Sequence, residues 1–104
     1  MAFYTEPPHY KKTALSDLQG AWENLRDIVV EARPFADWER LLFHIDEGMS
    51  WESVRNLESM RKALLLIQNI AAQSSVPAEV SEGIGVVREN LEEVFAAIAQ
   101  GEVR

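Results

Sequence analysis

Cysteine is absent from this chain of 104 residues, and its absence excludes several kinds of site. Without cysteine there can be no disulfide, no cysteine-based zinc site and no thiol nucleophile. The sequence has two histidines, His9 and His44, and they do not form the His-x-x-x-His pattern of a helical zinc site. It also lacks the two Glu-x-x-His motifs that a di-iron bundle needs. We therefore expect no metal and no cofactor.

Motifs of catalysis are missing as well. There is no Gly-x-Ser-x-Gly elbow for a serine nucleophile. The segment Gly83-Ile84-Gly85 is too short for a phosphate-binding loop and follows no strand. Glu89 and Glu93 share a helix face, but paired carboxylates need a concave site that perturbs their pKa values before they can do acid–base work. We expect no catalytic residues and no enzyme.

Positive charge and long apolar runs are also scarce. The chain has 10 lysines and arginines against 17 aspartates and glutamates, which gives a formal net charge of −7. This balance opposes direct binding to nucleic acid and to anionic membranes. The longest nearly apolar run, residues 63–72, is about half as long as a membrane span. No signal peptide is visible at the N-terminus, so we expect a cytoplasmic protein.

What the sequence does contain is a helical repeat of apolar residues. Hydrophobic residues make up 47% of the chain, which is ordinary for a single globular domain. From Thr13 onward they recur at spacings of three and four, the period of an α-helix. The pattern predicts four helices, over residues 14–32, 35–47, 51–74 and 77–100.

The expected boundaries follow from residues that start or stop helices. Pro34 ends the first helix, and Gly48 suits the left-handed position after the second. Ser50 is a good N-cap for the third, with Met49 and Val54 placed to form a hydrophobic staple. Short connections favour an all-α, four-helix up-and-down bundle in residues 13–104, whose second helix is short. Residues 1–12, with Pro7 in their middle, are expected to form an extended N-terminal arm.

Apolar residues also occur outside the stripes that a small bundle needs. In the third helix Leu66 and Ile70 point roughly opposite the main stripe, and Leu65 lies beside them. Phe43 is off the stripe of the second helix, and Trp51 is expected in the first turn of the third. These five residues are our predicted protein interface. The alternatives are that the third helix is covered on several sides and that the arm or the first helix covers Phe43.

The fourth helix carries an acidic surface, formed by Glu89, Glu92 and Glu93. Such a surface is either a solvated face or a docking surface for a basic partner, where charge raises the association rate more than the affinity.

These features together predict a non-enzymatic protein-binding module. A small inhibitor, an immunity or antitoxin-type protein, a chaperone and an adaptor all fit, and each would act through the apolar helix face. The partner is expected to be a protein, either a basic one or a second copy in a homodimer. The alternative is an acidic mimic of nucleic acid, which would occupy a DNA- or RNA-binding protein through the Glu-rich fourth helix.

Overall fold

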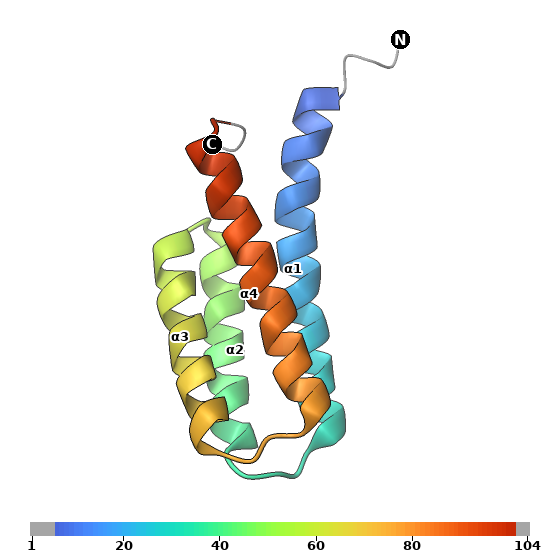
Figure 1. The fold of residues 1–104 in the computed structure, drawn as a ribbon, viewed down its shortest axis with the longest axis vertical. Helices are drawn as coiled ribbons and strands as arrows, with labels where there is room; N and C mark the ends of the chain where they lie inside the picture. The colour runs from blue at the N-terminus through green and yellow to red at the C-terminus, as the bar shows by residue number, and fades with distance from the viewer. Residues whose placement is uncertain (1–5, 102–104) are drawn as a thin grey trace.

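The computed structural model describes residues 6–101 and, within them, the side chains of residues 14–52 and 54–101. This part of the chain forms α1 (Glu6–Ala32), α2 (Trp38–Ser53), α3 (Leu57–Gln73) and α4 (Ala78–Ala99), and it contains no strand. Figure 1 shows the helices side by side, each running opposite to the one before it. The prediction of an all-α chain with four packed helices is confirmed.

The N-terminal boundary of α1 differs from the prediction. The helix begins at Glu6 rather than Ala14, so the extended arm predicted for residues 1–12 is corrected over residues 6–12. Residues 1–5 lie outside the described part of the chain. Pro7 and Pro8 fall in the first turn, where backbone N–H groups have no helical partner in any case, so the two prolines can begin this helix rather than prevent it.

Helix α2 runs through Gly48 and ends at Ser53, so the predicted C-cap at Gly48 is wrong. Gly48 is buried against α1, and a Cβ atom at this position would lie 2.5 Å from Cη2 of Trp22. The glycine therefore lets the Trp22 indole pack against the backbone of α2. Helices α2 and α3 contain 16 and 17 residues, so the second helix is longer than predicted and nearly as long as the third, although it is still the shortest of the four.

The third helix starts six positions after the predicted Trp51, at Leu57. Arg55 adopts a left-handed conformation with φ 59°, which turns the chain after α2. Asn56 then serves as the N-cap, because its side-chain oxygen accepts a hydrogen bond of 3.1 Å from the backbone N–H of Ser59. Trp51 consequently lies in the last turn of α2.

The core is apolar and includes side chains from all four helices; no polar side chain is buried among those described. Trp22 is fully buried, and its indole N–H donates to the sulfur of Met60 at 3.2 Å. Gly83 brings α4 close to Leu25 on α1. Helices α1 and α4 pack extensively, as do α2 and α3, whereas α3 and α4 are the least extensively packed neighbours. The bundle therefore has one loose seam.

Candidate functional site

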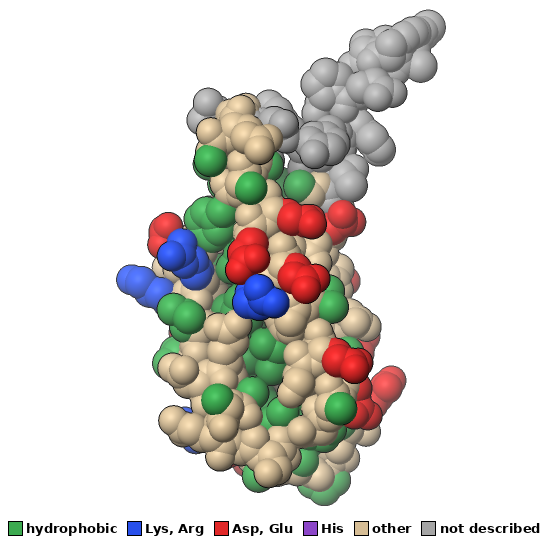
Figure 2. Space-filling view, viewed as in Figure 1, with side chains coloured by type: hydrophobic (Ala, Val, Ile, Leu, Met, Phe, Trp, Pro, Cys, Tyr) green, Lys and Arg blue, Asp and Glu red, His purple; other side chains and the backbone are tan. Residues whose placement is uncertain are grey.

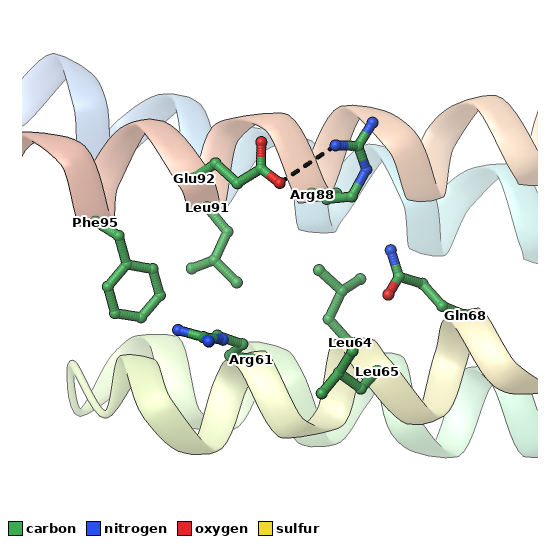
Figure 3. Close-up of a pocket in the computed structure, with 8 residues that line it drawn as sticks. All are labelled: Arg61, Leu64, Leu65, Gln68, Arg88, Leu91, Glu92 and Phe95. Atoms are coloured by element: carbon green, nitrogen blue, oxygen red, sulfur yellow. Dashed lines mark hydrogen bonds and ion pairs between the residues drawn. The ribbon is translucent and has the colours of Figure 1, made fainter.

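A groove follows the loose seam between α3 and α4 and has a volume of about 370 Å³. We call it the α3–α4 groove. A shallower hollow continues it along the same two helices, beside Ala72 and Ser81. Figure 2 shows hydrophobic side chains along this seam. The groove is lined from α3 by Arg61, Leu64, Leu65 and Gln68, and from α4 by Arg88, Leu91, Glu92 and Phe95 (Figure 3).

The floor and the lips of the groove are apolar. Leu64 and Leu91 form the floor, where they are 4% and 3% exposed. Leu65 is 53% exposed, while Phe95 is half-buried against the core. Successive residues of a helix point about 100° apart, so Leu64 faces the core while its neighbour Leu65 forms a lip. The groove thus presents apolar surface that no described side chain covers completely.

Charged side chains lie around this apolar strip. The Arg61 guanidinium lies 5.4 Å from the centre of the Phe95 ring, a cation–π contact. Arg61 forms no ion pair with any carboxylate among the described side chains. Across the groove, Arg88 contacts Glu92 at 3.3 Å and Glu89 at 3.9 Å. Figure 3 shows Arg61 and Phe95 at one end, Arg88 and Gln68 at the other, and the leucines between them.

The predicted interface residues do not form one continuous face. Leu65 lines the groove, but Leu66, which is 46% exposed, does not. Ile70 is only 5% exposed and belongs to the core, so its placement in an exposed interface was wrong. The physical reason is that α3 packs against α2 as well as against α4. The side of α3 that carries Ala63 and Ile70 is therefore covered.

Two further predicted residues lie on α2, away from the groove. Phe43 is 66% exposed, and its ring meets the edge of the His44 imidazole with a centroid separation of 5.2 Å. Trp51 is half-buried and packs against the core at the end of α2. Phe43, Leu65 and Leu66 are thus the exposed members of the predicted set, and their part in an interface stays a prediction.

The acidic surface lies largely on another side of α4. Glu89, Glu92 and Glu93 are all exposed, with Glu92 at the rim of the groove. Figure 2 shows acidic side chains over α4 and the neighbouring α1. Among the described side chains of α1, the exposed acidic residues are Asp17, Glu23, Asp27 and Glu31. The acidic surface is therefore wider than the fourth helix alone, although Arg88 contacts two of its carboxylates.

Sequence reasoning missed Arg61 and Phe95 as parts of the site. A signal was present for Phe95, because it follows Leu91 by four positions and lies beside, rather than on, the main apolar stripe of the fourth helix. Arg61 carried no such signal. Its position matters only because α3 and α4 separate enough for its side chain to lie over the ring.

Among the described side chains, no three histidine, aspartate or glutamate residues come together in a way that could hold a metal ion. None of the helices in the described range is long and apolar enough to cross a membrane. No protein-family model, curated protein or solved structure matches this chain.

Proposed function

We propose that this chain is a non-enzymatic protein-binding module whose binding surface is the α3–α4 groove. In this role it acts as a small inhibitor, an immunity or antitoxin-type protein, a chaperone or an adaptor. The proposal places the chain in the cytoplasm, with a protein partner and no direct contact with nucleic acid or membrane. The observation that carries it is the apolar strip of Leu65 and Phe95 over a buried leucine floor, bordered by charged residues.

This arrangement has the composition of a protein interface. Such interfaces have an apolar centre and a polar rim, and aromatic residues and arginine are enriched in them. Covering the exposed half of Leu65 contributes about 1 kcal/mol, and an aromatic ring at the same site adds contact area. A groove between two helices suits an apolar helix face, whose side chains enter at every third or fourth position. Arg61 and Arg88 flank the apolar strip, so they disfavour basic residues of the partner at these positions.

Site-specific photo-crosslinking tests the proposal, with Leu66 as a matched control for Leu65. Both leucines are exposed on α3, but only Leu65 lines the groove. A benzophenone side chain at position 65 should give a defined protein adduct in cells that express the chain. The same group at position 66 should give much less, and Arg61→Glu should weaken the adduct at position 65. Equal capture from both positions, or none from position 65, would contradict the proposal.

The acidic mimic of nucleic acid remains the second candidate. Its support is the breadth of the acidic surface, which spans α1 and α4. It predicts that changing Glu89, Glu92 and Glu93 together to glutamine abolishes partner binding, and that binding weakens steeply as salt rises. Binding that depends on Leu65 and ignores both of these changes would remove this candidate.

A further inference from the structure

We infer that the occupant of the α3–α4 groove is a second copy of this chain, packed about a two-fold axis that runs along the groove. This inference rests on the proposed function, because it names the partner of the same surface. Two-fold dimers are the commonest closed assemblies, and in them the same patch of each copy meets itself. The patch must therefore be complementary to itself in shape and in charge.

The directions of the two helices satisfy the first condition. Helices α3 and α4 run in opposite directions on either side of the groove (Figure 1). Rotation by half a turn about an axis parallel to them places α3 of one copy over α4 of its partner, again in opposite directions. The four helices, two from each copy, then surround the exposed leucine and phenylalanine lips in the manner of an antiparallel bundle.

The charges satisfy the second condition. Arg61 lies over Phe95, and Glu92 is less than one turn away from Phe95 on α4, so Arg61 and Glu92 stand at a similar height along the groove. The rotation brings Arg61 of each copy opposite Glu92 of the other. Within one chain, Arg61 has no carboxylate partner among the described side chains, and the dimer supplies it with one.

Net charge favours this face over the rest of the surface. Each copy has a net charge of −7, so two copies repel one another at long range. The groove lining, however, carries two arginines and one glutamate, whereas exposed acidic residues of α1 lie elsewhere. Two acidic copies can therefore approach closely through the groove, while a basic partner would meet Arg61 and Arg88 there.

The size of the α3–α4 face indicates which class of interface two copies would form. Helix α3 has 17 residues, which corresponds to about 26 Å of helix, and two adjacent helices are about 20 Å wide. Both copies together would bury on the order of 1,000 Å², at the lower end of specific interfaces. Interfaces this small are typical of weak, transient contacts, so we expect dissociation in the micromolar range.

Sedimentation velocity of the purified chain, from low micromolar to near-millimolar concentration, tests the dimer directly. We expect a shift from monomer to dimer across this range. Leu65→Glu should weaken the dimer about 100-fold or more, because it places two carboxylates in the apolar centre. Leu66→Glu, the matched control outside the groove, should leave the dimer unchanged. Circular dichroism at low concentration checks that both variants keep their helices.

A charge swap between copies gives the sharpest test. Arg61→Glu alone and Glu92→Arg alone should each weaken the dimer about tenfold, because two like-charged pairs form. An equal mixture of these two variants should recover the dimer, since each glutamate then faces an arginine of the other variant. Glu93→Arg makes the same charge change away from the groove lining and should not complement Arg61→Glu.

A wild-type chain that stays monomeric at every concentration, or a mixture that fails to recover, overturns the inferred dimer. The proposed function is tested by a different result from the one that tests the dimer. If the chain is monomeric but a benzophenone at position 65 crosslinks one defined foreign protein, the groove still binds protein and only the second copy is excluded. If position 65 captures neither, both ideas are wrong.

Discussion

The seam between α1 and α2 and the seam between α3 and α4 use large apolar side chains in opposite ways. In the first, Gly48 removes a side chain so that Trp22 can reach the backbone of the neighbouring helix. In the second, the large residues Leu65 and Phe95 lie at the lips instead of closing over the groove. Under the proposed function, the tight seam serves stability and the open one serves binding.

The largest loss of stability should come from removing the large side chain that fills the tight seam between α1 and α2. We expect Trp22→Ala to destabilise the protein by about 3–5 kcal/mol, because it leaves a large cavity in the core. The variant also removes the donor to Met60. Urea unfolding followed by far-UV circular dichroism measures the change in the free energy of unfolding. A decrease in the free energy of unfolding of less than about 1 kcal/mol would show that Trp22 is not closely packed at this seam.

Adding a methyl group to the tight seam should destabilise the protein less than removing the Trp22 side chain. Gly48→Ala places a Cβ atom 2.5 Å from Cη2 of the buried Trp22 ring, which cannot move without displacing its neighbours. We expect a destabilisation of about 1–3 kcal/mol, typical of overpacking, although alanine is the better helix former. The same unfolding experiment provides the measurement. An increase in stability would mean that Gly48 is not needed for close packing.

The same substitution at a glycine that faces open space should change the free energy of unfolding in the opposite direction. Gly85 lies inside α4, and a Cβ atom there meets nothing within 4 Å. Gly85→Ala should therefore stabilise the protein by up to about 1 kcal/mol through helix propensity alone. Comparison with Gly48→Ala under identical conditions separates packing from propensity. Destabilisation by Gly85→Ala would mean that this position is more closely packed than its open surroundings indicate.

The smallest effect on stability is expected at the lip of the groove. Leu65 is 53% exposed, so Leu65→Glu should change the free energy of unfolding of the monomer by no more than about 0.5 kcal/mol. Leu64→Glu, at the neighbouring buried position, serves as the contrast and should unfold the chain. If the two substitutions destabilise the monomer equally, Leu65 is a core residue and the groove is closed in solution.

The helical period was enough to predict the all-α class and the presence of four helices, because each buried stripe repeats within its own segment. The boundaries around Gly48 were not predictable, since a C-cap glycine and a packing glycine look alike until Trp22 is known to face it. At the site, Leu65 was found because it lies off the main stripe. Ile70 was misplaced because α3 packs against α2 as well as α4, and the apolar pattern of one helix does not show how many neighbours cover it.

The groove itself could not be predicted from the sequence. Its existence depends on how far α3 and α4 separate, and that separation is set by the packing of all four helices rather than by any local pattern. Arg61 and Phe95 become neighbours only in that arrangement.

Amide chemical-shift mapping by NMR, as the concentration of the purified chain is raised, tests the central claim most directly, namely that the α3–α4 groove is the binding surface. We predict shifts concentrated on the residues that line the groove, largest around Leu65 and Phe95, and absent from the acidic side of α1. Shifts that centre on α1, or spectra that do not change with concentration while no other protein contacts position 65, would contradict it.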